Sequence, residues 1–401
     1  MSEKGLSSFF EGFLNKESVF LDKKVLQGSF IPETVEHRDP QIDKIAHILA
    51  PCLRLEKPSN LFVYGKTGTG KTLAVKYTSE KIKETAEKAN IPLKIFYINC
   101  KLKRVADTEY RLIAQLTREF GREIPSTGLP TDDVYRIFFS TIDKEKQLIL
   151  IVLDEIDQLV KKTGDEILYN LTRINEELKQ SQIAIIGLSN DLMFIDHIDP
   201  RVKSSLSEEE ILFPPYNAFQ IQDILRRRVP LAFRDNVIEQ GVVEKCAAYA
   251  ARDHGDARRA LELLRVAGEL AERKGRITVA LRDIDDAEDT IERDRVVEIC
   301  EAQPKQSQLI LYSILSQKEV DLIHTGEVYE IYRNLCTQTG MRPLTQRRVS
   351  DVLAELDMLG IITVKVISKG RYGRTREISL SVPQIIIPKI IALLEQELSL
   401  A

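Results

Sequence analysis

Two short stretches combine residue types that could bind and hydrolyse a nucleoside triphosphate. The first is GKTGTGKT, residues 65 to 72, which matches G-x-x-x-x-G-K-[ST] between an apolar run and a helical segment. Its glycines would let backbone N–H groups turn toward an anion, Lys71 could reach the terminal phosphates, and Thr72 could ligate magnesium. An unliganded Gly-rich turn is the plain alternative, but a partner motif occurs further along the chain. The residues expected to bind the nucleotide here are Gly65, Lys66, Thr67, Gly68, Thr69, Gly70, Lys71 and Thr72.

The partner motif is LILIVLDEID, residues 148 to 157, a buried-strand pattern that ends in two carboxylates. Asp154 could hold Mg²⁺, and Glu155 could polarise the water that attacks the γ-phosphate. Alone, such carboxylates most often cap a helix, so their interpretation depends on the first motif. Asn190, at the end of the apolar run IAIIGLSND, could orient the same water, although an isolated Asn there is commonly a turn residue.

Two arginines could complete the site from other parts of the chain. Arg201, in IDPRVKSSL, could reach a nucleotide held by a neighbouring subunit, and a solvated surface charge explains it equally well. Arg258, in GDARRAL, begins a helical segment and could fold back onto the γ-phosphate. A salt bridge at the helix start is the alternative for Arg258.

The elements that must position these residues predict three domains. Apolar runs near residues 60, 93, 147 and 182 alternate with longer amphipathic segments, the pattern of a mostly parallel α/β sheet flanked by helices. A fifth candidate strand begins at 209, and helical periodicity then continues to about residue 300. From Pro304 three helical segments precede two strands, the order of a winged helix-turn-helix. We expect an α/β nucleotide-binding domain at 1–207, a small helical domain at 208–302 and a winged helix at 303–401.

The composition predicts a compact cytoplasmic protein without a membrane partner. Hydrophobic residues make up 43% of the 401 positions, which is enough for packed cores, and no run approaches the apolar length of a membrane span. The five cysteines are far apart and never spaced as CxxC, which argues against both a disulfide framework and a zinc site.

Basic residues gather near the C-terminus although the formal net charge is −4. From Arg342 to Glu377 there are eight basic and four acidic residues. In a winged helix the third helix enters the major groove and the hairpin tip follows the backbone or enters the minor groove, so we expect DNA contacts here. A hairpin used for protein contacts is the alternative, because the fold does not fix the ligand. The expected DNA-binding residues are Arg342, Thr345, Gln346, Arg347, Arg348, Lys369, Gly370, Arg371, Tyr372, Gly373 and Arg374, whereas Tyr312, Tyr329 and Tyr332 are expected in the core.

In their order and sequence context these motifs resemble the AAA+ ATPases of the initiator clade. With the winged helix, the chain resembles the archaeal origin recognition and cell-division-cycle initiator family, relatives of the eukaryotic origin recognition complex, over about residues 15 to 395. The resemblance implies that Lys71, Thr72, Asp154 and Glu155 bind and hydrolyse MgATP, that Asn190 is sensor 1, that Arg201 is a finger acting in trans, and that Arg258 is sensor 2. It also implies that His37 and Arg38 lie near the adenine, and that Lys101, Lys103 and Arg104, at the start of an extra helical insert, could approach DNA or simply be solvated.

The resemblance implies a replication initiator with slow, switch-like ATP hydrolysis. Its ATP-loaded module would position the winged helix on double-stranded origin DNA at the nucleoid and help recruit an MCM-type replicative helicase. The cofactors would be ATP or ADP with Mg²⁺, and other initiator paralogues would be further partners. Three alternatives stay open. A signalling ATPase coupled to a transcriptional regulator usually lacks equivalents of Arg201 and Arg258, a clamp-loader-like motor would end in helices rather than a hairpin, and a plain DNA-binding module could hold ATP as a structural filler.

Overall fold

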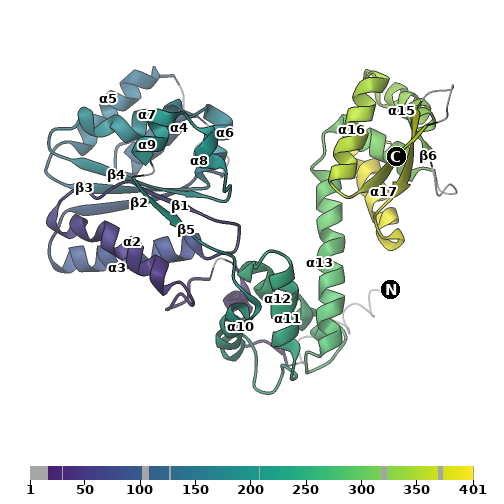
Figure 1. Cartoon of the computed structure of the whole chain (residues 1–401), viewed down its shortest axis with the longest axis horizontal. Coiled ribbons are helices and arrows are strands. Elements are labelled where there is room, and N and C mark those ends of the chain that lie inside the picture. The colour runs from purple at the N-terminus through teal and green to yellow at the C-terminus, as the bar shows by residue number, and fades with distance from the viewer. Residues whose placement is uncertain are drawn as a thin grey trace, which may run out of the picture. The chain divides into compact units, whose positions relative to one another are not determined.

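The computed structural model divides the chain into two compact units, residues 1–284 and 285–401 (Figure 1). It describes residues 17–28, 30–101, 108–125, 128–206, 208–317, 323–368 and 374–400. The first unit contains the α/β sheet and the helical segment that follows it, and the second contains the winged helix. The three domain boundaries expected from the sequence stay a prediction.

A five-stranded parallel sheet forms the centre of the first unit, with strand order β2-β3-β4-β1-β5. Its strands are β1 (Leu61–Tyr64), β2 (Leu93–Asn99), β3 (Leu148–Asp154), β4 (Gln182–Ser189) and β5 (Glu209–Leu212). The apolar runs and the fifth candidate strand of the sequence are therefore confirmed as strands. Every residue of β3 is buried, as expected for a strand inside a sheet that helices cover on both faces.

Helices pack on both faces of this sheet (Figure 1). One layer contains α2 (Asp39–Leu49) and α3 (Lys71–Lys88), with η2 (Ala50–Arg54) after α2. The other layer contains α4 (Glu109–Glu119), α5 (Thr131–Ile142), α6 (Ile156–Thr163), α7 (Glu166–Arg173), η3 (Ile174–Glu176), α8 (Phe194–His197) and α9 (Pro200–Leu206). In β3 the side chains at 149, 151 and 153 join the core under the second layer, and those at 148, 150 and 152 join the core under the first. This alternation is the strand period of two, and it gives the sheet a core on each face.

A small helical lid follows β5 in the same unit. It contains α10 (Ala218–Ala232), α11 (Val242–Arg252) and α12 (Ala257–Arg273). A capping box between Asn217 and Gln220 begins α10, and the Asp256 side chain begins α12 by accepting two backbone N–H groups. The N-terminal η1 (Lys23–Leu26) contacts α10 and α12, and the Phe20 ring stacks on Phe233 at a centroid distance of 4.7 Å. Phe20 and η1 are therefore part of the lid's packing.

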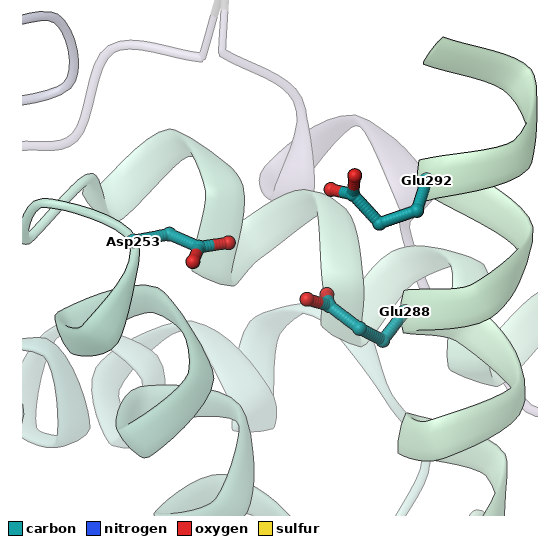
Figure 2. Close-up of side chains that lie close together, drawn as sticks. All are labelled: Asp253, Glu288 and Glu292. Atoms are coloured by element: carbon teal, nitrogen blue, oxygen red, sulfur yellow. The ribbon is translucent and has the colours of Figure 1, made fainter. Parts of the chain in front are cut away.

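The second unit is a winged helix with its own core. Its helices are most of α13 (Leu281–Glu301), then α14 (Lys305–Leu315), α15 (Thr325–Thr339), α16 (Gln346–Met358), η5 (Gln384–Ile386) and α17 (Ile387–Leu398). Its antiparallel sheet has the strand order β6-β8-β7 and consists of β6 (Ile323–His324), β7 (Ile362–Ser368) and β8 (Arg374–Leu380). The predicted hairpin is confirmed. The sequence did not predict β6 or α17. On α13, Glu288 and Glu292 project from successive turns of one helix face, as their spacing requires (Figure 2).

The five cysteines are all buried free thiols. Burial raises the pKa of Cys52 and Cys100 to about 12 and that of Cys300 to about 11. Among the described residues, the structure contains no helix that is both long enough and apolar enough to span a membrane.

Candidate active site

The phosphate loop joins the end of β1 to the start of α3. Gly65, Gly68 and Gly70 have φ angles of +154°, +69° and +88°, which only glycine adopts without strain. The space around two of them is closed as well, because a Cβ at Gly65 would lie 2.4 Å from the carbonyl oxygen of Phe213 and a Cβ at Gly68 would lie 1.7 Å from Asp256 Oδ1. The loop shape therefore depends on glycine at these positions.

Lys71 lies buried inside this loop at the first turn of α3. Its Nζ donates hydrogen bonds to the carbonyl oxygens of Gly65 and Lys66 at 2.6 and 2.7 Å. Burial lowers the pKa of Lys71 to about 8, and the nearby charge of Asp154 opposes that shift. The ammonium group is thus placed where the loop would surround the phosphates of a nucleotide.

Hydroxyl and carboxylate groups meet beside Lys71. Thr72 Oγ1 donates to Asp154 Oδ2 at 3.0 Å, and the Tyr97 hydroxyl donates to the same oxygen. Asp154 ends β3 and pairs in register with Asn99 of β2, which brings Tyr97 close to it. A threonine hydroxyl and a carboxylate are the hard oxygen ligands that Mg²⁺ prefers, so Thr72 and Asp154 fit a magnesium ion. Tyr97 belongs to no spacing motif, and only the register of β2 and β3 identifies it.

Glu155 and Asn190 follow the neighbouring strands β3 and β4 and line the same cleft. Glu155 has φ of +56° and begins α6, and its side chain is 22% exposed. Its Oε2 lies 3.9 Å from Nζ of Lys101. The carboxyl ends of adjacent parallel strands thus present a carboxylate and an amide to one space, as the sequence predicted.

A cleft of about 1140 Å³ contains these groups and continues between the sheet and the lid. Phosphate-loop residues, Asp154, Glu155 and Asn190 are among the residues that line it. The apolar side chains that also line it include Val25, Phe30, Ile31, Pro32, Val35, Ile224, Leu231 and Leu261. Arg258, from the first turn of α12, lines it too. The structure therefore brings Arg258 to the same cleft as the phosphate loop.

Arg201 lies elsewhere. Its side chain is 67% exposed, and its guanidinium donates to Asp199 at 3.0 and 2.9 Å and lies 4.9 Å from the centre of the Tyr169 ring. Hydrogen bonds to Asp199 raise the pKa of Arg201 and lower the pKa of Asp199 to about 2. Arg201 is not among the residues that line the cleft of its own chain.

Arg38 lies under the phosphate loop and outside the lining of the cleft. Only 2% of it is exposed, Nε donates to the carbonyl oxygen of Thr69 at 2.8 Å, and Nη2 donates to that of Pro214 at 2.6 Å. The guanidinium also lies 3.7 Å from the centre of the Tyr216 ring. His37, also expected near the base, lies 3.2 Å from Asp223 of α10 and does not line the cleft either. Arg38 therefore braces the loop against the segment that leads to the lid.

The winged helix presents a basic surface at the start of α16. The expected DNA-binding residues on this helix and just before it are all exposed, namely Arg342, Thr345, Gln346, Arg347 and Arg348. Thr345 Oγ1 caps the helix by accepting the Arg348 N–H at 3.4 Å, and the Arg348 side chain lies 3.6 Å from Asp351. Tyr329 and Tyr332 hydrogen-bond to the Leu344 backbone and pack on the core, so their expected core position is confirmed.

Several expected DNA-binding residues lie outside the described residues. These are Lys103, Arg104, Lys369, Gly370, Arg371, Tyr372 and Gly373. Arg374 begins β8, and Lys101 follows β2 next to Glu155.

Comparisons with known proteins agree with this architecture. Three family models match, described as an AAA domain at residues 54–192, a Cdc6 AAA+ ATPase-type lid domain at 222–289 and a CDC6 C-terminal winged helix domain at 298–389. The chain is 51% identical over 388 residues to the ORC1-type DNA replication protein of Thermococcus onnurineus, which covers 95% of this chain and 93% of the relative. The chain belongs to the family of ORC1-type DNA replication proteins.

Two further relatives of this ORC1-type family are similar over nearly the whole chain. The ORC1-type DNA replication protein of Pyrococcus abyssi is 52% identical, with 94% of this chain and 91% of the relative covered. A solved structure of the Aeropyrum pernix ORC1 protein in complex with DNA is 41% identical, has a TM-score of 0.81 and covers 95% of this chain and 98% of that one. The expected fold class is therefore confirmed, and the chain is an AAA+ ATPase with a nucleotide-binding domain.

Proposed function

We propose that this ORC1-type protein is an ATP-regulated replication initiator. It binds double-stranded origin DNA through its winged helix, and it helps recruit an MCM-type replicative helicase in its ATP-bound state. The observation that carries the proposal is the shared cleft, which is lined by the phosphate loop, by Asp154 and Glu155, and by Arg258 of the lid. A nucleotide that contacts both sides would couple its γ-phosphate to the lid position.

Each residue of the site has a separate task in this proposal. Thr72 and Asp154 would hold Mg²⁺, which supplies positive charge to the β- and γ-phosphates. Lys71 binds the terminal phosphates, and Glu155, with Asn190, orients the attacking water. Arg258 contacts the γ-phosphate from the lid.

Arg201 acts on the nucleotide of a neighbouring copy or a paralogue. This role is supported by its exposure and by the fact that it is not among the residues lining the cleft of its own chain. Its hydrogen-bonded pairing with Asp199 holds the guanidinium in a fixed orientation on the surface.

Origin binding is assigned to the exposed N-terminal turn of α16 and to the hairpin tip. Arg342, Gln346 and Arg347 can face base edges in the major groove, because side chains at a recognition helix's start contact bases. Lys369 and Arg371 of the tip are proposed to contact phosphates along the minor groove, with Lys101, Lys103 and Arg104 as a second contact. The solved complex of the Aeropyrum pernix ORC1 protein with DNA supports DNA binding by this chain, and the residues named here are the proposal.

The test is footprinting of the full-length protein on genomic fragments with ATP, with ADP and without nucleotide. We expect protection at origin repeats whose extent changes between ATP and ADP. Lys71→Ala should remove the nucleotide dependence, whereas Arg347→Ala should weaken origin binding by about 1 to 3 kcal/mol and leave random-DNA affinity nearly unchanged. Protection spread over many promoters would instead favour a transcriptional regulator. Helicase recruitment is tested separately, by capturing purified MCM-type helicase on origin DNA with wild type and with Lys71→Ala.

A further inference from the structure

Arg228 of α10 is a buried cation with an unused donor. It is 9% exposed, and its Nη1 has no hydrogen-bond partner among the residues that the structure describes. The two arginines that precede it are exposed and have acidic partners, Arg226 with Glu244 at 3.0 Å and Arg227 with Glu36 at 2.7 Å. A buried donor without an acceptor is costly, which points to a partner that arrives with a ligand.

The helix places Arg228 in the wall of the nucleotide cleft. Ile224, Arg228 and Leu231 are spaced by four and three residues, lie on one face of α10, and all line the cleft. The centre of the Phe30 ring, from the segment that follows η1, lies 4.5 Å from the guanidinium carbon. Beside the guanidinium of Arg228, this part of the cleft therefore presents the apolar side chains of Ile224, Leu231 and Phe30, and such a wall suits a flat heterocycle.

The same cleft contains the phosphate loop. Lys71 and Thr72 lie there together with Asp154. Burial lowers the pKa of Arg228, and the charge that opposes this shift belongs to Glu36 rather than to any of these phosphate-loop neighbours. A nucleotide whose phosphates occupy the loop would thus present its base to the wall that contains Arg228.

We propose that Arg228 is a specificity-determining residue that donates a hydrogen bond from Nη1 to a ring nitrogen of the bound adenine. A guanidinium contains only donors, so it pairs with an unprotonated ring nitrogen and not with the amino group of the base. Phe30 lies against the guanidinium and holds its plane. The inference rests on the proposed nucleotide site and adds to it the residue that reads the base.

The test measures binding of ATP and of its 1-deaza, 3-deaza and 7-deaza analogues, each of which replaces one ring nitrogen by C–H. Wild type should bind one analogue about tenfold more weakly than ATP, since a hydrogen bond from a charged donor is lost. Arg228→Met should bind ATP about tenfold more weakly and should no longer distinguish that analogue from ATP. Arg226→Met, which changes an exposed arginine of the same helix, is the matched control and should behave as wild type.

A melting curve of the nucleotide-free protein separates this role from a structural one. Replacing a buried unpaired cation by methionine should leave Tm unchanged or raise it, and should reduce the Tm increase that ATP produces. A lower Tm with an equal loss of affinity for ATP and all three analogues would overturn the inference.

The analogue series on wild type decides the question even where Arg228→Met does not fold. Equal affinity of wild type for ATP and all three analogues would overturn the role of Arg228 and leave the nucleotide site standing. Failure of wild type to bind ATP would overturn the nucleotide site itself.

Discussion

Replacing Arg38 by methionine tests whether this residue braces the phosphate loop. The change keeps most of the buried stem and removes the hydrogen bonds to the carbonyl oxygens of Thr69 and Pro214 together with the contact on Tyr216. The buried bond to Thr69 is charge-assisted and contributes about 1.5 to 3 kcal/mol, and the ring contact about 0.5 to 2 kcal/mol. We expect a loss of about 3 kcal/mol in the free energy of unfolding, which lowers Tm by about 5 °C in a unit of 284 residues.

The assay combines a melting curve with binding of ATP, GTP and CTP. Since Arg38 shapes the loop that surrounds the phosphates, its replacement should lower the affinity for all three nucleotides by a similar factor. Arg54→Met, a change at an exposed arginine of the same unit, is the control and should leave both measurements near wild type. An unchanged Tm with a loss of ATP affinity alone would show that Arg38 does not support the phosphate loop, and it would favour the contact with the base that the family resemblance implied.

Three further predictions concern the phosphates and their surroundings. Lys71→Ala should abolish nucleotide binding, whereas Glu155→Gln should keep ATP and block turnover, as equilibrium binding and phosphate release would measure; equal loss of binding in both would remove Glu155 from its role. Gly68→Ala puts a methyl group 1.7 Å from Asp256 Oδ1 at a φ of +69°, so ATP affinity should fall at least about tenfold and Tm should drop, and wild-type values would mean that the lid yields freely. Arg201→Ala should leave ATP affinity unchanged and lower the ATPase rate that appears on assembly, and the same defect in a strictly monomeric sample would contradict action in trans.

The parts of the site that the sequence predicted are those with a local signal. The phosphate loop needs its glycines for its own backbone angles, and a strand buried on both faces is a continuous apolar run, so both are visible within about ten residues. Strand β6 has only two residues and exists through pairing with β8, which no local pattern reveals.

The residues that the sequence did not assign depend on contacts between distant segments. Arg38 was expected near the base from the family resemblance alone, yet its hydrogen-bond partners lie 31 and 176 residues away. Tyr97 reaches Asp154 through the register of neighbouring strands, and the unused donor of Arg228 follows from the packing of Phe30 against the lid. No spacing rule connects such pairs, because the number of residues between them is set by the intervening helices.

The burial of every cysteine makes the natural protein suitable for site-directed labelling. Because only the thiolate reacts and burial both covers the native thiols and raises the pKa of Cys52, Cys100 and Cys300, a maleimide dye should leave them unmodified at neutral pH. Cysteines introduced at two exposed lysine or arginine positions, Lys81 on α3 and Arg273 on α12, would then accept a donor and an acceptor fluorophore in the wild-type background. Energy transfer between them would follow the lid relative to the sheet through a complete cycle of ATP binding, hydrolysis and ADP release.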